Sequence, residues 1–380
     1  MARKIRVGMI GYGQMGRIHA YAYRTIPVFY DPIPFEVELT AVADVVDGVA
    51  ERAVAQAGFR RGTKDWREVV AAPDVDVIDI CTPNSEHLPV LEAAIVAGKD
   101  IYCEKPLCTG LADARRILAL AQKAGIRHQI VSEYRFLPAV RKAKELIEQG
   151  FVGDLFHFRG VYLHSGYIDP KRPISWRLRR EATGGGALVD LGPHIIDVMR
   201  HLVGDASAVL GTCSTFIPER PLAERPSEMA RVDVEDAASV LLRFPGGGSG
   251  TLEVSRCATG AEDELRFEVQ GSSGALSFNL MDPNWLYAYD ATLPEGSRGF
   301  QRLATVQRYP APAVAPAPKF SIGWVRSHVA AQFAFLDAIA RGSVPSPSFV
   351  DAVWVHAYQD AIYRSAVAPA WTAVPTVDRE

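Results

Sequence analysis

The chain has 380 residues, more than a single hydrophobic core usually serves, so we expect two domains. Hydrophobic residues make up 48% and charged residues 22% of it, as in an ordinary globular protein. The formal net charge of −3 gives no general attraction to nucleic acid or anionic membranes, so composition and charge argue against a role on either.

Cysteine usage and the N-terminus bear on the compartment. The cysteines are odd in number and irregularly spaced, which indicates reduced thiols and not a disulfide framework: Cys81, Cys103, Cys108, Cys213 and Cys257. No cluster of His, Cys, Asp or Glu has metal-ligand spacing, so no metal is expected. The N-terminal apolar run breaks at glycines before it reaches signal-peptide length, and no apolar stretch approaches a membrane span. We therefore expect a cytoplasmic protein.

From residue 5 to about residue 132, short apolar runs alternate with helical patterns. The predicted strands are Ile5–Ile10, Val37–Ala43, Val75–Cys81, Asp100–Cys103 and Arg127–Val131, and the predicted helices include Gln14–Arg24, Glu86–Ala97 and Leu111–Ala124. Continuous apolar strands are typical of a parallel sheet covered on both faces. The alternation predicts an α/β Rossmann domain with a doubly wound parallel sheet, placed at residues 1–134.

After about residue 150, strands follow one another with few helices between them. The predicted strands are Leu155–Leu163, Ala206–Phe216, Ala237–Phe244, Gly250–Ser255, Glu264–Gln270 and Ala275–Asn279, with helices at roughly 189–203, 324–341 and 349–366. This order predicts an α+β domain over residues 135–380 with a large, mostly antiparallel sheet. The Pro-Ala segment 310–318 is expected to be an extended surface tether.

A glycine-rich motif, Gly11-Tyr-Gly13-Gln14-Met15-Gly16, directly follows the first predicted strand and opens a helix. In that context the first glycine makes a tight turn, the second lets backbone approach a pyrophosphate, and the third allows close packing of helix on strand. The helix N-terminus then offers free N–H groups to the phosphates. A purely structural turn is the alternative, but the context favours a dinucleotide site.

An acidic residue, Asp44, ends the second predicted strand. It lies farther from the glycine motif than usual, and the proline- and aromatic-rich insertion Thr25–Pro34 accounts for the excess. A carboxylate here accepts hydrogen bonds from the adenosine ribose and repels a 2′-phosphate. Since no Lys or Arg follows closely, NAD is favoured over NADP.

Two later loops lie at carboxyl ends of predicted strands, where open α/β sheets bind ligands. Thr82-Pro83-Asn84-Ser-Glu-His87 follows one strand, and Glu104-Lys105-Pro106 follows the next. On sequence alone, Lys105 could equally be an ordinary surface residue.

In the second half, Gly184-Gly-Gly precedes Asp190 and His194, which stand four residues apart. On one helix they would share a face, and a carboxylate beside an imidazole can fix its tautomer and raise its basicity. A plain helix-surface pair is the alternative reading.

In this order, and over nearly the whole chain, these motifs resemble the Gfo/Idh/MocA oxidoreductase family. Glu-Lys-Pro combined with Asp-x-x-x-His is far more specific than the glycine loop alone. Tyr134-Arg135 and Ser175-Trp-Arg177 resemble the levoglucosan and inositol dehydrogenase branches. The resemblance implies an open-faced sheet that mediates a homodimer or homotetramer, and a C-terminal segment that returns toward the Rossmann domain.

The resemblance also implies an NAD-dependent dehydrogenase that takes a hydride from a secondary hydroxyl carbon of a sugar, anhydrosugar or inositol. Lys105 would stabilise the reacting oxygen, His194 would take its proton, and Asp190 would orient His194. Motifs and resemblance together assign cofactor binding to Gly11, Gly13, Gln14, Met15, Gly16, Asp44, Thr82, Pro83, Asn84, His87, Glu104, Lys105, Trp176 and Arg177. They assign substrate binding to Lys105, Tyr134, Arg135, His164, Lys171, Arg172, Asp190 and His194.

The nature of the substrate stays open at this point. The stretch 164–180 is basic, and it is either a solvated loop or a wall that binds an anionic sugar: Lys171, Arg172, Arg177, Arg179 and Arg180. Some relatives with this fold are NAD-dependent glycosidases that oxidise C3, eliminate the C1 substituent, add water and reduce the ketone, so glycoside hydrolysis is the alternative function. A non-catalytic NAD-binding regulator is a third reading.

Overall fold

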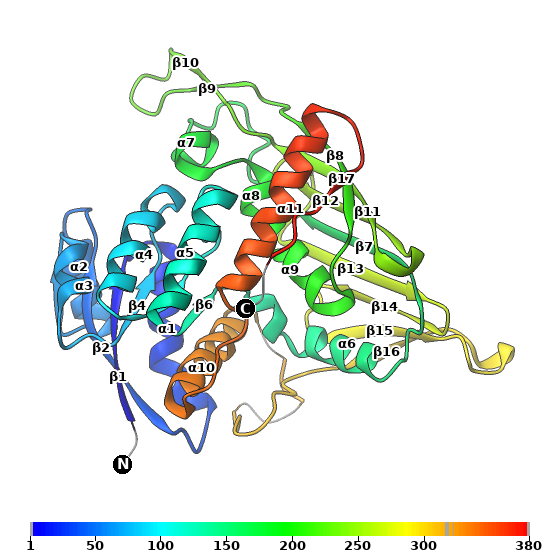
Figure 1. Ribbon diagram of the computed structural model, residues 1–380, viewed down its shortest axis with the longest axis horizontal. Helices are drawn as coiled ribbons and strands as arrows, with labels where there is room; N and C mark the ends of the chain where they lie inside the picture. Colours follow the sequence, from blue (N-terminus) through cyan, green and yellow to red (C-terminus); the bar gives the residue numbers. More distant parts are fainter. Residues whose placement is uncertain (1–2, 316–318, 322, 378–380) are drawn as a thin grey trace. The chain divides into compact units, whose positions relative to one another are not determined.

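In the computed structural model, residues 3–315, 319–321 and 323–377 are described (Figure 1). The chain divides into two compact units. Unit 1 comprises residues 1–136 and 309–353, and unit 2 comprises residues 137–308 and 354–380. Each unit is described by itself.

Unit 1 is built on a six-stranded sheet of order β3-β2-β1-β4-β5-β6, and every neighbouring pair is parallel. The strands are β1 (Arg3–Ile10), β2 (Phe35–Ala43), β3 (Arg61–Thr63), β4 (Val77–Ile80), β5 (Asp100–Cys103) and β6 (His128–Ile130). This is the strand order of a Rossmann domain, so the predicted parallel sheet is confirmed. The short strand β3 escaped prediction because its three residues are not apolar and stay at least partly exposed.

The helices of unit 1 are α1 (Gln14–Phe29), α2 (Val49–Ala57), α3 (Trp66–Ala71), α4 (His87–Val96), α5 (Leu111–Ala124) and α10 (Val325–Arg341), with 3-10 turns at η1 (Asn84–Glu86) and η2 (Glu133–Phe136). Helix α1 runs five residues past its predicted end at Arg24, through Pro27, into the segment expected to be an insertion. At its end, Tyr30 stacks on Phe333 of α10, with ring centroids 3.7 Å apart. Of the Pro-Ala segment, residues 316–318 lie outside the described residues, and Ala313 forms a bridge to Tyr30.

Unit 2 is built on a nine-stranded sheet of order β16-β15-β14-β13-β7-β12-β11-β8-β17, in which only β7 and β12 pair in parallel. The strands are β7 (Leu155–Leu163), β8 (Ala208–Ser214), β11 (Ala237–Arg243), β12 (Ser249–Ser255), β13 (Glu264–Gly271), β14 (Gly274–Asn279), β15 (Trp285–Asp290), β16 (Phe300–Ala304) and β17 (Thr372–Ala373). The predicted large, mostly antiparallel sheet is confirmed. Strands β15 and β16 extend it beyond the prediction, and β16 is too polar and exposed to carry a strand pattern.

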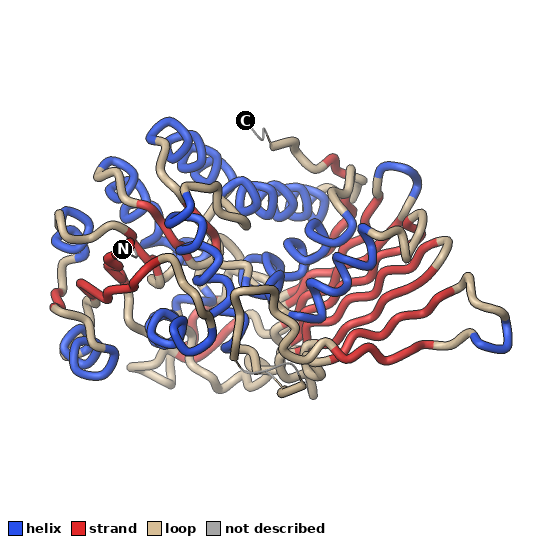
Figure 2. The backbone as a smooth tube through the Cα atoms, turned by 90° about the horizontal axis from the view of Figure 1, so that it is seen from below, coloured by secondary structure: helices blue, strands red, loops and turns tan. Residues whose placement is uncertain are grey.

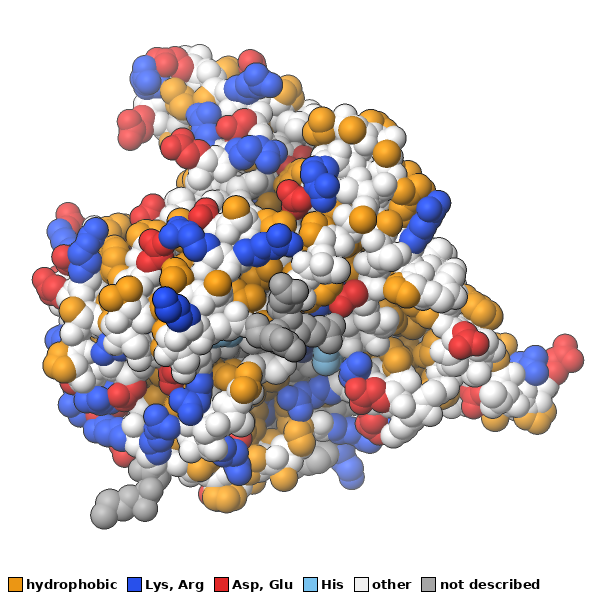
Figure 3. All heavy atoms as spheres, in the orientation of Figure 1, with side chains coloured by type: hydrophobic (Ala, Val, Ile, Leu, Met, Phe, Trp, Pro, Cys, Tyr) orange, Lys and Arg blue, Asp and Glu red, His pale blue; other side chains and the backbone are white. Residues whose placement is uncertain are grey.

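A separate hairpin of unit 2 joins β9 (Glu219–Pro221) to β10 (Met229–Arg231). Figure 3 shows acidic and basic side chains interspersed on this part of the surface.

The helices of unit 2 are α6 (Pro138–Glu148), α7 (Arg180–Thr183), α8 (Ala187–Asp190) and α9 (Gly192–Val203), and α11 (Phe349–Val367) has its first residues in unit 1 and the remainder in unit 2. Helices gather on one side of the sheet (Figure 2). Along β11, Val240 and Leu242 are buried beneath them whereas Leu241 is 47% exposed on the opposite side. On β7, a Cβ at Gly160 would lie 2.7 Å from Ile195 of α9, so α9 packs directly against bare backbone.

The single helix predicted at 189–203 is in fact two, α8 and α9, separated at Leu191. Pro193 lies in the first turn of α9, and its missing N–H and ring disfavour continuation of α8 through this point. Among the described residues, no helix combines the length and apolar character needed to cross a membrane.

Candidate active site

The glycine loop of unit 1 has the geometry that a pyrophosphate site requires. Gly11 has φ +90°, and a Cβ there would lie 2.7 Å from the carbonyl oxygen of Cys81. A Cβ at Gly16 would lie 2.3 Å from the carbonyl oxygen of Gly11, whereas a Cβ at Gly13 meets nothing within 4 Å. Helix α1 begins at Gln14 with no side-chain cap, so the first-turn N–H groups of Gln14 and Met15 face the open side of the loop. These residues fit a dinucleotide phosphate.

The carboxylate of Asp44 is fixed beside that loop. Its Oδ2 accepts the N–H of Tyr12 at 2.8 Å, and its Oδ1 accepts the N–H of Val46 at 2.9 Å. Tyr12 is itself packed edge-on against Phe59. A partly exposed carboxylate with defined oxygens at the end of β2 fits the hydroxyls of an adenosine ribose.

His87 joins the loops that follow β4 and β5. It is buried, with Nδ1 2.9 Å from the carbonyl oxygen of Pro106 and Nε2 2.9 Å from that of Thr82. Burial lowers the pKa of His87. Both ring nitrogens lie against backbone carbonyls, and the neutral ring can donate to one of them, which agrees with a loop-building role for His87 rather than with proton transfer.

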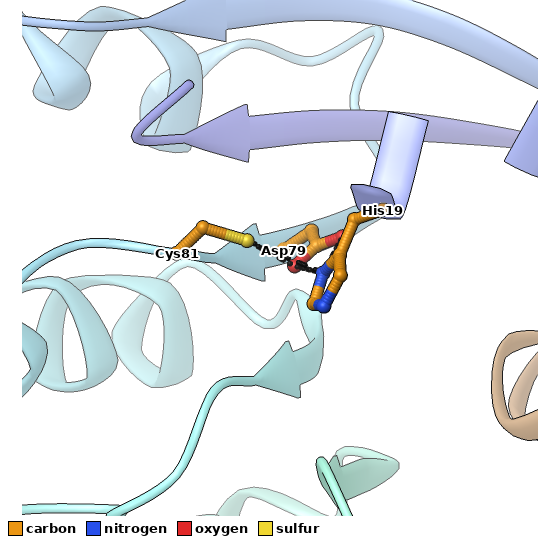
Figure 4. Close-up of side chains that lie close together, drawn as sticks. All are labelled: His19, Asp79 and Cys81. Carbon is orange, nitrogen blue, oxygen red and sulfur yellow. Dashed lines mark hydrogen bonds and ion pairs between the residues drawn. The ribbon is translucent and has the colours of Figure 1, made fainter. Parts of the chain in front are cut away.

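Beneath the Glu-Lys-Pro motif lies a buried group of ionisable residues that sequence spacing did not indicate. His19 of α1 contacts both oxygens of Asp79 through Nδ1, at 3.0 Å each, and Oε1 of Glu104 through Nε2 at 3.1 Å. The Sγ of Cys81 lies 3.2 Å from the same Nδ1 (Figure 4). Oε2 of Glu104 accepts the backbone N–H of Lys105 at 3.1 Å. His19 is the centre of this cluster.

In unit 2, Asp190 is the last residue of α8 and pairs with an arginine that the sequence did not single out. Nη2 of Arg256 lies 3.3 Å from Oδ2 of Asp190 and 3.1 Å from the carbonyl oxygen of Gly186, and its Nη1 donates to the carbonyl of Arg177. Arg256 is 2% exposed. A buried guanidinium therefore fixes one oxygen of Asp190 to the head of its own helix.

His194, in the first turn of α9, is buried against Tyr162, whose ring lies edge-on at 5.5 Å. The hydroxyl of Tyr162 donates to Oδ1 of Asp263 at 2.7 Å, and Nε2 of His164 lies 3.0 Å from the same oxygen. Burial raises the pKa of Asp263, but its bonds to His164 and Tyr162 and the charge of His194 lower it overall. The two predicted histidines, His164 and His194, thus belong to one cluster. That cluster also contains Tyr162 and Asp263, which the sequence did not predict.

The arginines of the stretch 164–180 are mostly engaged within unit 2. Arg172 donates to the carbonyl of Gly166, and Arg179 donates to that of Arg231 at 3.1 Å. The backbone N–H of Arg180 donates to Asp233 at 2.7 Å, and its guanidinium donates to the carbonyl of Gly184 at 3.2 Å. These contacts fold the loop on itself, which is closer to the structural alternative than to an anion-binding wall.

Of the other predicted substrate residues, Tyr134 is buried in unit 1, and Nη2 of Arg135 lies 2.9 Å from Oδ1 of Asp351. Arg177 lies over the ring of Trp176, with its Cζ 4.5 Å from the ring centroid, and Lys171 is exposed.

Residues 5–132 match the model of an oxidoreductase family with an NAD-binding Rossmann fold, and residues 140–277 match the GFO/IDH/MocA C-terminal domain. The chain belongs to the Gfo/Idh/MocA oxidoreductase family. It is 36% identical to a levoglucosan dehydrogenase of Pseudarthrobacter phenanthrenivorans over 99% of both chains, and 29% identical to a myo-inositol 2-dehydrogenase of Thermotoga maritima over 77% of this chain and 81% of that one. A solved levoglucosan dehydrogenase in complex with NADH and levoglucosan superposes with a TM-score of 0.94 at 37% identity, covering 98% of this chain and 100% of that one.

This Gfo/Idh/MocA protein is therefore an NAD-dependent oxidoreductase. The expected fold class, family and cofactor are confirmed.

Proposed function

We propose that this protein oxidises a secondary alcohol of an uncharged anhydrosugar, with levoglucosan as the first candidate and other sugars and inositols as the wider class. The observation that carries the proposal is the 36% identity to levoglucosan dehydrogenase along 99% of both chains. The self-folded arginine loop supports an uncharged substrate, because the guanidinium groups of Arg172, Arg179 and Arg180 already donate to backbone carbonyls of unit 2.

In the proposed site, the residues that would hold NAD are the glycine loop, Asp44 and the loops after β4 and β5. NAD, when bound, accepts a hydride. Lys105 stabilises negative charge on the reacting oxygen, and His194 takes the proton of the hydroxyl. Asp190, held by Arg256, orients His194 and supports its protonated form.

The deciding experiment incubates the purified protein with NAD and a panel of levoglucosan, neutral sugars, inositols and anionic glycosides. Absorbance at 340 nm and released aglycone are followed together. NADH that rises in step with loss of levoglucosan or another neutral sugar is the expected result. Release of aglycone without net NADH would instead establish a redox-neutral glycosidase, and strict preference for anionic sugars would refute the uncharged substrate.

The catalytic roles predict the behaviour of two variants. Lys105→Met and His194→Ala should each lower kcat by about 100-fold or more, because each removes a group that acts on the reacting oxygen or its proton. The affinity for NAD, measured by fluorescence titration, should stay within about threefold. Lys123→Met, at an exposed position in the last turn of α5, is the matched control and should leave kcat unchanged. Full turnover in both catalytic-site variants would refute this assignment.

We further propose that the uncovered face of the nine-stranded sheet binds a second copy of this chain. Leu241 is 47% exposed there, and Arg302 lies over the ring of Trp285 with its Cζ 4.0 Å from the centroid. Light scattering should give two or four times the chain mass of 41.5 kDa. Leu241→Lys should shift the mass toward one chain, because it places a charge in an apolar contact. A wild-type mass of 41.5 kDa would refute the proposal.

Cytoplasmic location stays a prediction, which rests on the five cysteines being free thiols in the structure.

A further inference from the structure

His19 has a carboxylate at each of its two ring nitrogens. Nδ1 lies 3.0 Å from both oxygens of Asp79, on β4, and Nε2 lies 3.1 Å from Oε1 of Glu104, just after β5. Figure 4 shows the ring of His19 reaching from α1 to Asp79 and Cys81. His19 and Asp79 are completely buried and Glu104 is nearly so.

This geometry fixes the charge of the imidazole. A neutral imidazole has one N–H and can donate from only one nitrogen, whereas an imidazolium donates from both. Two ionised carboxylates accept but cannot donate, so the arrangement is fully satisfied only by an imidazolium between two carboxylates. Burial acts to lower the pKa of His19, but Asp79 and Cys81 together outweigh burial and raise it well above its ordinary value. Burial likewise acts to raise the pKa of Glu104, yet the bond to His19 and the charges of His19 and Lys105 lower it to about 2.

Besides His19, Lys105 is a cation near the two carboxylates among the described residues, and its charge also lowers the pKa of Glu104. The titratable groups nearest to His19 in unit 1 are Cys81, Tyr23, Tyr102, His328, Glu133 and Lys105. Burial and the charge of His19 lower the pKa of His328 to about 3, so it is neutral. Burial and Asp79 raise the pKa of the Cys81 thiol, so a protonated Cys81 adds no negative charge beside His19. With both nitrogens of His19 engaged, the cluster is an ion bridge.

Glu104 transmits this arrangement to Lys105. Its Oε1 is held by His19, and its Oε2 accepts the backbone N–H of Lys105 at 3.1 Å. We propose that His19, as a charged bridge between Asp79 and Glu104, is a positioning residue that holds Glu104 and through it sets the place of Lys105. The proposal rests on the catalytic role given to Lys105 in the proposed function.

The test uses two double variants in the full chain, because loss of His19 alone would leave two buried carboxylates without a cation. Both variants carry Asp79→Asn, which removes one negative charge along with the positive one. His19→Gln places its amide near the position of Nε2 and keeps a donor for Glu104, whereas His19→Asn places its amide near Nδ1 and loses that donor. Circular dichroism and NAD affinity confirm that both variants are folded.

We expect kcat of the Gln variant to stay within about tenfold of wild type and that of the Asn variant to fall by about 100-fold, as for a misplaced catalytic group. Both variants lose the positive charge of His19, but the Asn variant also loses the hydrogen bond to Oε1 of Glu104. The pKa of Glu104 should therefore rise further in the Asn variant, and its acid limb of kcat/KM should lie about one unit higher in pH than that of the Gln variant. Equal turnover and equal pH profiles in the two variants would overturn the positioning role.

Two measurements need no sugar and so separate this proposal from the proposed function. Nitrogen-15 NMR of the imidazole should show His19 doubly protonated above neutral pH, and a neutral His19 there would overturn the charged bridge. Reductive carbon-13 methylation should give Lys105 a signal, assigned with Lys105→Arg, that matches wild type in the Gln variant and shifts in the Asn variant. An unshifted signal in both would overturn the proposal whatever the substrate proves to be.

Discussion

At the scale of single residues, each oxygen of the Asp44 carboxylate accepts a different backbone N–H group. The carboxylate accepts the N–H of Tyr12 inside the glycine loop and the N–H of Val46 just beyond β2, so the charge sits at a defined place. A fixed carboxylate attracts ribose hydroxyls and repels a phosphate at the same position. We therefore expect discrimination between NAD and NADP to depend on this side chain.

Asp44→Ser should lower the ratio of kcat/KM for NAD to that for NADP by about 100-fold, because it removes both a charged acceptor and the repulsion of a 2′-phosphate. Asp47→Ser is the matched control, since Asp47 is exposed three residues later and pairs with Lys64. An Asp44→Ser enzyme that keeps the wild-type ratio would show that another group selects the cofactor.

At the scale of elements, the short helix α8 depends on a carboxylate from a distant loop. Oε1 of Glu235 accepts the N–H groups of Gly186 and Leu188 and the hydroxyl of Tyr363, each at 2.9 Å. A Cβ at Gly186 would lie 1.9 Å from the carbonyl oxygen of Glu235, so the loop and the head of α8 are in direct contact. Glu235 thus replaces the missing intrahelical partners of α8, whose last residue is Asp190.

Glu235→Ala should lower the free energy of unfolding by about 3 kcal/mol, because three buried donors lose their acceptor. Tyr363→Phe removes only one of these bonds and should cost about 1 kcal/mol. Urea unfolding of both variants measures whether Glu235→Ala loses more unfolding free energy than Tyr363→Phe does. If Glu235→Ala were no less stable than Tyr363→Phe, the capping role would be refuted.

At the scale of the whole molecule, stability should depend on pH through histidines buried in both units. Burial lowers the pKa of His128 to about 4, that of His328 to about 3 and that of His356 to about 4. The unfolded chain binds protons at these residues below the ordinary value of 6.5 while the folded chain does not, so acid favours unfolding. His19 has the opposite sign, because its raised pKa stabilises the folded chain most below 6.5 and loses that contribution as pH rises.

The free energy of unfolding should therefore be greatest near neutral pH and fall by about 2 kcal/mol per buried neutral histidine by about pH 5. Urea titrations at a series of pH values measure this slope. His328→Phe removes a histidine whose two ring nitrogens have no hydrogen-bond partner among the described residues. In this variant the pH dependence of the free energy of unfolding should correspond to about one proton fewer taken up on unfolding. A stability that does not change between these pH values would contradict the prediction.

The sequence predicted those parts of the site that are local in the chain. Gly11 and Gly16 follow a strand at a fixed spacing, and their close contacts with backbone confirm why no side chain fits there. The parallel sheet followed from its apolar strands, whereas the break at Leu191 was missed because the apolar pattern runs on through Gly192 and Pro193.

Contacts that depend on strand order could not be predicted. Arg256 and Asp263 reach Asp190 and Tyr162 only because β12 and β13 flank β7 in the sheet. Similarly, His19 meets Asp79 and Glu104 because β4 and β5 are neighbours, a pairing that no spacing in the chain reveals.

Gly160 on β7 limits which substitutions unit 2 can accept near His194. A methyl group at this position would lie 2.7 Å from Cγ1 of Ile195, the residue next to His194, so the side chain of Ile195 or α9 itself would have to shift. Because Gly160 has no Cβ, α9 packs close to β7, and this close packing fixes the position of the His194 imidazole relative to the sheet. We expect that substitutions of side chains around His194 can change substrate preference only in variants that keep glycine at position 160.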